Sequence, residues 1–346
     1  MVCGLSRILI VGMGSIGKRY ISIISELYPE ISIALLRHQK CSDQFNMTEV
    51  DCCVSSIDDA LEFKPHAAII ANPASHHLDT AIPLANAGVH LLIEKPISIT
   101  SEGLDKLINI CSDNDVTLMT GYNLRFLPSL QAFRRYLNEK KVGKVLSVRA
   151  EVGQYLPNWR VDSDYRNTVS AQKILGGGVL LELSHEIDYL LWLFGRVDWV
   201  NAHISKQSNL EIDVEDTAYI MFGFEENDSD YQLTASLNMD FIRHDTTRNC
   251  TVIGEEGSLR WDGINGSVEI FKINGSEWES IFSDKPGKNY TYKKELKHFF
   301  KCIEQREQAL ITGEEGMLSI NVIDAIRLSS QYSKLVYPKQ FIGSPQ

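Results

Sequence analysis

Short, largely apolar stretches alternate with longer amphipathic stretches from the N-terminus to Gly121. The short stretches predict β-strands, and the longer stretches between them predict helices. Predicted strands cover residues 8–11, 31–36, 67–71, 90–93 and 116–119, and predicted helices cover residues 17–27, 78–86 and 102–111. Because apolar strands that alternate with helices form parallel sheets covered on both faces, residues 1–121 are predicted to be an α/β domain.

After Gly121 the pattern changes to strands with a period of two residues. Apolar side chains alternate with polar ones at Leu233, Ala235, Leu237 and Met239, which is typical of a strand buried on one face. Further predicted strands cover residues 146–155, 217–224, 251–253, 258–261 and 268–273, and a last helix covers about residues 319–335. Residues 122–346 are therefore predicted to form an α+β domain with an open, mostly antiparallel sheet. One face of this sheet should pack on helices, and the other should be solvated or form a subunit interface.

Length and composition agree with two domains. A chain of 346 residues, 44% of them hydrophobic, is too long for one ordinary core. The formal net charge of −11 argues against nucleic acid as a partner, because phosphate contacts need clustered Lys and Arg. No apolar run approaches the about 20 residues of a membrane span, and no long apolar leader begins the chain, so we expect a cytoplasmic protein. The seven cysteines lack CxxC spacing, which favours thiols over disulfides or a metal site.

A glycine-rich motif follows the first predicted strand and opens the first predicted helix. The motif reads GMGSIG, and its candidate cofactor-binding residues are Gly12, Met13, Gly14, Ser15, Ile16 and Gly17. Gly12 makes the tight turn, Gly14 lets the backbone approach a pyrophosphate, and Gly17 lets helix and strand pack closely. The motif alone is weak evidence, but with strand, helix and next strand around it, it predicts a Rossmann domain that binds a dinucleotide.

The residues at the end of the second predicted strand bear on the choice of cofactor. An acid about 20 residues beyond the motif would hold the ribose 2′-hydroxyl of NAD. Arg37 and His38 stand there instead, with no acid at the strand end. A guanidinium suits a 2′-phosphate, so we predict NADP in preference to NAD, although an arginine at a strand end is also common on solvated surfaces.

Several further motifs run in order along nearly the whole chain. They are AIIANPASHH at residues 68–77, AGVHLLIEKP at 87–96, GYNLRF at 121–126, GGGVLLELSHEID at 176–188 and GEEG at 313–316. Together they resemble the glucose-fructose oxidoreductase/inositol dehydrogenase/MocA family. The resemblance implies a Rossmann domain, a C-terminal open-sheet domain that often mediates oligomerisation, and NAD(P)-dependent chemistry on sugars or cyclitols.

The resemblance also implies further cofactor contacts and an assembly. The residues it adds to the cofactor site are Asn72, Pro73, His76, Glu94, Lys95, Pro96, Asn123 and Arg125. It implies a homodimer or homotetramer formed through the C-terminal sheet, a sugar-type small molecule as the substrate, and no metal.

Lys95 is the first candidate for catalysis. Hydride transfer between a carbinol carbon and nicotinamide needs a proton donor or acceptor at the hydroxyl oxygen. Lys95 follows a predicted strand end, where such sheets bind ligands, and its ammonium could polarise that oxygen. In the family this lysine lies beside nicotinamide and substrate, and the Lys95–Pro96 bond is expected to be cis. Without the family, a surface lysine in a turn would be an equal interpretation.

The second candidate lies on the helix predicted after Gly178. That helix is apolar nearly all round, so it should be buried, and it carries Glu182, His185 and Asp188 at a spacing of three. Buried ionisable groups are costly unless paired or functional, so these three could converge on one substrate pocket. We assign His185 as acid/base with Lys95 assisting, and Glu182 would hold a substrate hydroxyl or orient Lys95.

Two observations leave this assignment open. A core histidine satisfied by a helix neighbour is the usual alternative, and a metal site from the three residues is a weaker one. The commoner family pattern also has Asp at the position of Glu182 and four residues from that acid to the histidine. The spacing of three rotates His185 by about 100° on a helix, so whether it reaches the nicotinamide is open.

A long aromatic and charged segment connects the second domain's first strand to this helix. Its candidate substrate-binding residues are Tyr155, Trp159, Arg160, Tyr165, Arg166 and Lys173. Aromatic rings stack on sugars and Arg pairs with carboxylates or phosphates, although a solvated loop is about as good an interpretation. The segment resembles family members of bacterial surface-sugar and nonulosonic-acid pathways, which implies an anionic sugar such as a nucleotide sugar or a sialic-acid-like acid. A cyclitol dehydrogenase and a non-catalytic NAD(P)-binding sensor are the alternatives.

Overall fold

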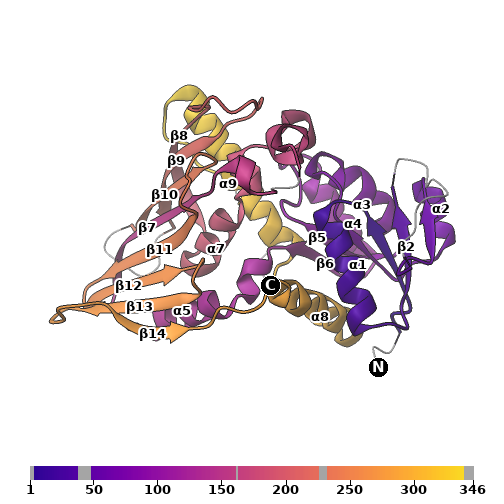
Figure 1. Cartoon of the computed structure of the whole chain (residues 1–346), viewed down its shortest axis with the longest axis horizontal. Helices are drawn as coiled ribbons and strands as arrows, with labels where there is room; N and C mark the ends of the chain where they lie inside the picture. Colours follow the sequence, from indigo (N-terminus) through magenta and orange to yellow (C-terminus); the bar gives the residue numbers. More distant parts are fainter. Residues whose placement is uncertain (1–3, 38–47, 161–162, 226–231, 339–346) are drawn as a thin grey trace. The chain divides into compact units, whose positions relative to one another are not determined.

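The computed structural model describes residues 4–37, 48–160, 163–225 and 232–338 (Figure 1). The chain forms two compact units. The first contains Met1–Tyr122 and Thr291–Ile320, and the second contains Asn123–Tyr290 and Asn321–Gln346. The sequence-based division into 1–121 and 122–346 places residues 291–320 in the second domain, whereas in the structure they return to the first unit.

The first unit contains a parallel six-stranded sheet in the order β3-β2-β1-β4-β5-β6. The strands are β1 (Arg7–Val11), β2 (Ser32–Leu36), β3 (Cys52–Val54), β4 (Ala67–Ile70), β5 (His90–Glu94) and β6 (Leu118–Gly121). The helices are α1 (Ser15–Leu27), α2 (Ile57–Glu62), the 3₁₀ turn η1 (Ala74–His76), α3 (His77–Asn86), α4 (Leu104–Asp113) and α8 (Tyr290–Gln305). Ile8, Leu9 and Ile10 are all fully buried, and since successive strand residues point to opposite faces, the sheet is covered on both faces. The strand order is that of a Rossmann fold, which confirms the prediction.

The second unit contains an eight-stranded sheet in the order β14-β13-β12-β11-β7-β10-β9-β8. The strands are β7 (Val145–Gly153), β8 (Val197–Ser205), β9 (Thr217–Phe224), β10 (Thr234–Asp240), β11 (Thr247–Gly254), β12 (Gly257–Asp262), β13 (Ser267–Lys272) and β14 (Glu279–Ser283). All neighbours are antiparallel except β7 and β10, so the predicted open, mostly antiparallel sheet is confirmed.

Helices cover one face of this sheet. They are η2 (Asn123–Phe126), α5 (Pro128–Asn138), α6 (Val179–Glu182) and α7 (His185–Phe194), and short 3₁₀ turns lie at Leu156–Asn158, Tyr165–Asn167, Val169–Ala171 and Lys173–Leu175. In the sheet, α5 contacts β12 to β14 and α6 contacts β9 and β10. On β9 the buried Ile220 and Phe222 alternate with Tyr219 and Met221, which are 48% and 50% exposed. The sheet therefore has one covered face and one open face.

The last helix, α9 (Gly313–Tyr332), begins earlier than predicted. The side chain of Glu315 accepts a hydrogen bond from the Thr312 N–H (3.0 Å), and the Thr312 hydroxyl accepts one from the Glu315 N–H (3.3 Å). This reciprocal pair is a capping box, which satisfies two N–H groups that would otherwise lack a partner at the helix start. The helix therefore begins directly after Thr312, six residues before the predicted start at about residue 319.

The helix predicted after Gly178 is two helices. α6 ends at Glu182 and α7 begins at His185, and Leu183 between them leaves the helical conformation with φ −101° and ψ 22°. The prediction of one continuous helix is therefore wrong, and the argument that a spacing of three sets the direction of His185 does not apply across this break.

Two further findings concern the cysteines and the surface. Cys52, Cys111, Cys250 and Cys302 are free, whereas Cys53 is disulfide-bonded, so the expectation of thiols alone is wrong there.

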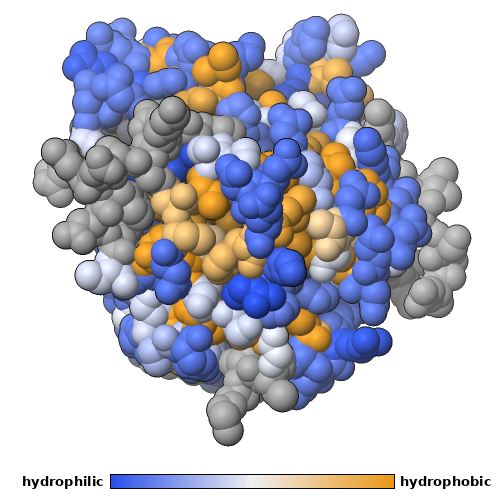
Figure 2. All heavy atoms as spheres, turned by 90° about the vertical axis from the view of Figure 1, so that its right-hand side faces the viewer, coloured by the Kyte–Doolittle hydropathy of each residue, from blue (hydrophilic) through white to orange (hydrophobic). Residues whose placement is uncertain are grey.

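Within the described ranges, no helix combines the length and apolar character needed to cross a membrane. Figure 2 shows apolar side chains gathered near the middle of one face and surrounded by hydrophilic ones.

Candidate functional site

A cavity of about 620 Å³ lies at the carboxyl ends of β1, β2 and β4 in the first unit. Six of its lining residues are ones the sequence predicted for the cofactor: Gly12, Met13, Arg37, Asn72, Pro73 and His76. The cavity is also lined by Val11, Leu36, Ser55, Ser56, Ile57, Asp79 and Thr80. This edge is where open α/β sheets bind dinucleotides.

The three motif glycines are required for different reasons. Gly12 has φ +93°, and a Cβ there would lie 2.8 Å from the Ala71 carbonyl oxygen and from the Asn72 nitrogen. A Cβ at Gly17 would lie 2.1 Å from the Gly12 oxygen, so helix and strand pack too closely for a side chain. A Cβ at Gly14 would have no neighbour within 4 Å among the described residues, so none of them requires this glycine. Open space in front of its backbone fits the close approach of a pyrophosphate.

Asn72 and His77 connect the turn that follows β4 to the turn that follows β5. The Asn72 amide donates to the Thr80 hydroxyl (3.3 Å), while its Oδ1 is buried with no hydrogen-bond partner among the described residues. The His77 ring lies 2.9 Å from the Asn72 carbonyl and 3.0 Å from the Pro96 carbonyl. Burial lowers the pKa of His77 to about 4, so the ring is neutral and donates to one carbonyl at a time. Sequence reasoning named His76, which is exposed and lines the cavity, and missed the buried His77.

Arg37 lies at the cavity beside residues that sequence reasoning missed. Its N–H donates to the Val54 carbonyl (3.1 Å), which places Ser55 and Ser56 next along the neighbouring strand end. Ser56 caps α2 by accepting from the Asp59 N–H. Predicting the short strand Cys52–Val54 would have placed the two serines at its carboxyl end, but that strand was not predicted. His38, predicted with Arg37, lies outside the described residues.

Lys95 follows β5 at the same edge of the sheet. The Lys95–Pro96 bond is cis, as the resemblance implied. The Lys95 N–H donates to Oε2 of Glu94 (3.3 Å), and Glu94 is only 8% exposed. Burial raises the pKa of Glu94 to about 7, against the opposing charge of Lys95. A titratable carboxyl therefore lies directly beside the candidate catalytic lysine.

The structure joins Arg125 and Asp188, which sequence reasoning assigned separately to cofactor and substrate. Arg125 donates to both Asp188 oxygens (2.7 and 3.0 Å), and the two side chains are 2% and 0% exposed. Trp192 lies beside the guanidinium, with its ring centroid 5.6 Å from Cζ. Asn123, on the same 3₁₀ turn η2, is buried as well. Such a bidentate buried pair holds η2 to α7 within the second unit.

Glu182 and His185 flank the break between α6 and α7. Glu182 accepts a hydrogen bond from the Ser170 hydroxyl (3.0 Å), and His185 is the first residue of α7. Glu215 was missed: its side chain accepts from the Leu180 N–H (3.3 Å), and burial raises its pKa. A Cβ at Gly178 (φ +103°) would lie 2.4 Å from Glu215 Oε1, so this glycine admits the carboxylate.

The aromatic residues of the connecting segment pack against the protein. Tyr155 stacks near His244 with ring centroids 4.1 Å apart, and Trp159 lies edge-on to Phe241 at 5.1 Å. The Tyr165 hydroxyl accepts from the Glu211 N–H (3.2 Å).

The cations of this segment differ in their partners. Arg166 is exposed and pairs with Asp164 (2.8 Å) and Glu211 (3.1 Å). The Lys173 N–H donates to Asp213 (2.7 Å). Arg160 is exposed, and no ion pair of its side chain occurs within the described ranges.

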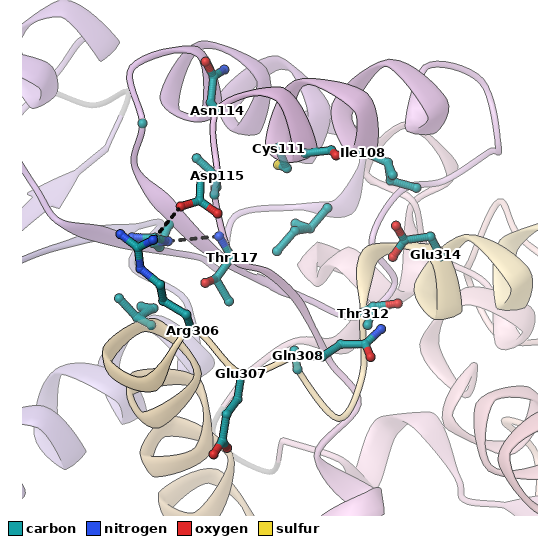
Figure 3. Close-up of a pocket in the computed structure, with 17 residues that line it drawn as sticks. Ile108, Cys111, Asn114, Asp115, Thr117, Arg306, Glu307, Gln308, Thr312 and Glu314 are labelled. Carbon is teal, nitrogen blue, oxygen red and sulfur yellow. Dashed lines mark hydrogen bonds and ion pairs between the residues drawn. The ribbon is translucent and has the colours of Figure 1, made fainter. Parts of the chain in front are cut away.

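A second cavity, of about 660 Å³, lies at the amino ends of β5 and β6 (Figure 3). Asp115 and Arg306 point toward one another there at 3.7 Å, and both are 85% exposed, so this ion pair contributes little stability. Because ligands of Rossmann sheets bind at the opposite, carboxyl edge, we do not assign the cofactor here. Among the described residues, no group of three or more His, Cys, Asp or Glu could hold a metal ion.

Family models match most of the chain. The family described as "Oxidoreductase family, NAD-binding Rossmann fold" matches residues 6–122, and "Oxidoreductase family, C-terminal alpha/beta domain" matches residues 134–337. The chain is 24% identical to the 2,7-anhydro-N-acetylneuraminate hydratase of Mediterraneibacter gnavus, over 96% of this chain and 97% of that protein.

Two solved structures share the fold over nearly the whole chain. A levoglucosan dehydrogenase in complex with NADH superposes with a TM-score of 0.84 at 20% identity, covering 97% of this chain and 100% of that one. The WlbA dehydrogenase from Bordetella pertussis, in complex with NADH and UDP-GlcNAcA, gives 0.80 at 21% identity, with the same coverage.

The buried pair of Arg125 and Asp188 generates a stability prediction. Asp188→Ala should lower the free energy of unfolding by about 3–5 kcal/mol in urea, because it removes the carboxylate that pairs with a buried guanidinium. Arg125→Met combined with Asp188→Leu should restore much of this loss. Glu279→Ala, which breaks the exposed Lys272–Glu279 pair, is the control and should change little. A loss for Asp188→Ala no larger than that of the control would contradict the structural role.

Proposed function

Because this chain belongs to the GFO/IDH/MocA oxidoreductase family, we propose that it is a dehydrogenase or reductase acting on a sugar. It moves a hydride between a bound nicotinamide dinucleotide and a carbinol or keto carbon. The observation that carries the proposal is the cavity that collects Gly12, Arg37 and Asn72 at the carboxyl edge of the sheet, with Lys95 ending the strand next to β4. Polar loops around a glycine turn, with a lysine at the same edge of the sheet, suit redox chemistry at a carbon that carries a hydroxyl group.

The nicotinamide supplies or accepts the hydride when the dinucleotide is bound. The protein then has to supply or accept a proton at the substrate oxygen. We assign this proton to Lys95, which directly follows the buried Glu94, and to His185 as a second acid/base. Arg125 is less suited to a ligand role because its charge is already balanced by Asp188.

The substrate class in this proposal is an anionic sugar, such as a nucleotide sugar or a sialic-acid-like acid. Its support is the exposed Arg160 on the aromatic segment, and two of the similar proteins carry sugar acids or nucleotide sugars in their names. Tyr155 and Trp159 already pack against other rings of the protein. This favours a role as a wall of the substrate site beside this arginine over a role in which their rings stack on the sugar.

NADP is the proposed preference over NAD. Arg37 and two serines line the same cavity, and together they supply a cation and hydroxyl donors for a 2′-phosphate. The family is NAD-binding, and the similar structures contain NADH, so the preference rests on these residues alone.

A cytoplasmic location and a homodimer or homotetramer complete the proposal. The open face of the eight-stranded sheet, which exposes Tyr219 and Met221, is the surface we assign to assembly.

Turnover is the direct test of the enzyme proposal. With a panel of sugars and nucleotide sugars, Lys95→Ala and His185→Ala should each lower kcat by about 10²–10⁴-fold, because each removes a proton-transfer group. Lys106→Ala, at an exposed position on α4, is the control and should leave kcat unchanged. Nicotinamide absorbance measures the rate. Near-normal turnover in either variant would remove that residue from the mechanism, and cofactor binding without turnover across the panel would favour the sensor.

Cofactor choice is tested by fluorescence titration with NADPH and NADH. Arg37→Ala should weaken NADPH binding by about 10- to 100-fold, the loss of a charge-assisted contact, and leave NADH within about threefold. Arg7→Ala is the control, since Arg7 begins β1 at the other edge and bonds the Lys64 carbonyl. Tighter binding of NADH than NADPH by the unsubstituted protein would sink the preference.

Assembly is tested by sedimentation. Met221→Glu, which places a charge on the open face of β9, should shift the protein toward monomer because a charge is costly to bury in an interface. Ile273→Glu, at a site 68% exposed beyond β13, is the control and should leave the oligomer intact. A monomeric unsubstituted protein would rule out this interface.

A further inference from the structure

The cavity of about 660 Å³ at the amino ends of β5 and β6 has no part in the proposed function (Figure 3). All residues that line it belong to the first unit. Helices α4 and α8 end at this cavity, and α9 begins there. Asp115 and Arg306 lie on one side of it, and Glu314 lies on the other. The cavity therefore presents charges of both signs at a place that the nicotinamide chemistry does not use.

Asp115 and Arg306 occupy equivalent positions just after the two helices. Asp115 follows α4 with φ +54°, and Arg306 follows α8 with φ +52°. In both cases the N–H of the next residue donates to the carbonyl five positions before it, at 2.8 and 3.1 Å. This helix ending usually takes glycine, because a side chain is strained at a positive φ. Each charged residue therefore stands at this cavity at a cost to the backbone.

The ion pair between the two side chains does not offset this cost. Asp115 Oδ2 and Arg306 Nη1 are 3.7 Å apart, and both side chains are 85% exposed, so water and salt screen their attraction. What the pair offers is an anion and a cation side by side. An α-amino acid carries its ammonium and its carboxylate on one carbon, and these can pair with Asp115 and Arg306 through charge-assisted hydrogen bonds.

His90 adds a donor to the lining of the cavity. The Thr117 N–H donates to Nδ1 of His90 (2.9 Å), so the neutral ring carries its proton on Nε2. Burial lowers the pKa of His90, which keeps the ring neutral at neutral pH. Because His90 lines the cavity, its Nε2–H can serve a ligand carboxylate together with the guanidinium.

The remaining lining bears on the side chain of such a ligand. Ile108, Cys111 and Val116 are buried and line the cavity, so they offer an apolar surface. Glu314, exposed on the other side, would repel an acidic side chain. The lining therefore favours an apolar side chain over an acidic one.

We propose that this cavity is a second ligand site, which binds an α-amino acid with an apolar side chain. Arg306 and His90 hold the carboxylate, Asp115 holds the ammonium, and the side chain lies against Ile108 and Cys111. The site is independent of the proposed sugar chemistry, because its residues lie at the amino edge of the sheet and Lys95 lies at the carboxyl edge.

Ligand-observed NMR on the whole protein tests the site with L-leucine and two analogues. 4-Methylpentanoate lacks the ammonium of leucine, and 3-methylbutylamine lacks its carboxylate. Leucine should bind with a Kd below about 10 mM, and each analogue should bind about 10-fold or more weakly, because it loses one charge-assisted contact. Absence of leucine binding in this range overturns the site. Binding of either analogue as tight as that of leucine overturns the pairing with both charges.

Two variants assign each charge of the ligand to its partner. Arg306→Gln should weaken leucine and 4-methylpentanoate by about 10-fold and leave 3-methylbutylamine unchanged, whereas Asp115→Asn should weaken leucine and 3-methylbutylamine. Glu26→Gln and Lys293→Gln, which break an ion pair between α1 and α8 in the same unit, are the controls. Leucine binding that is unchanged in both Arg306→Gln and Asp115→Asn places it elsewhere and overturns the site.

Arg306→Gly separates binding from folding. Glycine suits φ +52°, so this variant should keep or raise the Tm of the ligand-free protein and still weaken leucine as much as Arg306→Gln does. A folded Arg306→Gly protein that binds leucine normally overturns the role of the guanidinium. These measurements need neither cofactor nor sugar, so a failed turnover panel would reject the proposed function and leave this inference standing.

Discussion

The parallel pairing of β1 with β2 and β4 is the constraint on which the cofactor cavity depends. Val11 pairs in register with Leu36 on one side and Ile70 on the other, so three strands end side by side. Side chains that follow those ends meet at one cavity although they come from distant parts of the sequence. β5 continues the same register, which is why Lys95 and the carboxyl beside it lie at this edge.

Periodicity predicted the elements whose burial pattern is strong. β1, β4 and β9 were predicted nearly to the residue because their apolar positions follow the sheet's geometry. β3 is three half-buried residues, too short for any period to register. α8 has a clear apolar face of Leu296, Phe299 and Phe300, but no local signal says that this face packs in the first unit. Tertiary contacts place α8 in the first unit, so a single domain boundary near residue 121 could not describe how the chain returns to that unit.

The candidate site divides in the same way. Motif glycines such as Gly12 were predictable because each acts through its own backbone turn, whereas the cis Lys95–Pro96 bond was implied only by the family resemblance. Glu215 acts through a contact with Leu180, far away along the chain, and Ser55 follows a strand too short to predict, so no spacing marks either residue. For Asp188 the sequence marked the residue but not its partner. A buried acid indicates either a function or a partner, and the sequence could not reveal that Arg125 balances its charge.

The strongest argument for a dinucleotide comes from what the protein leaves unused at the cavity. The chain itself explains Gly12 and Gly17, where a side chain would collide with backbone, but no atom in the described part of the chain explains Gly14. In the cavity, the Asn72 Oδ1 is buried with no partner among the described residues. A buried acceptor is costly unless something donates to it. A ligand that fits here brings a group that can approach bare backbone and a donor for the Asn72 oxygen. A nicotinamide dinucleotide offers both, with pyrophosphate oxygens for the first and hydroxyl or amide donors for the second.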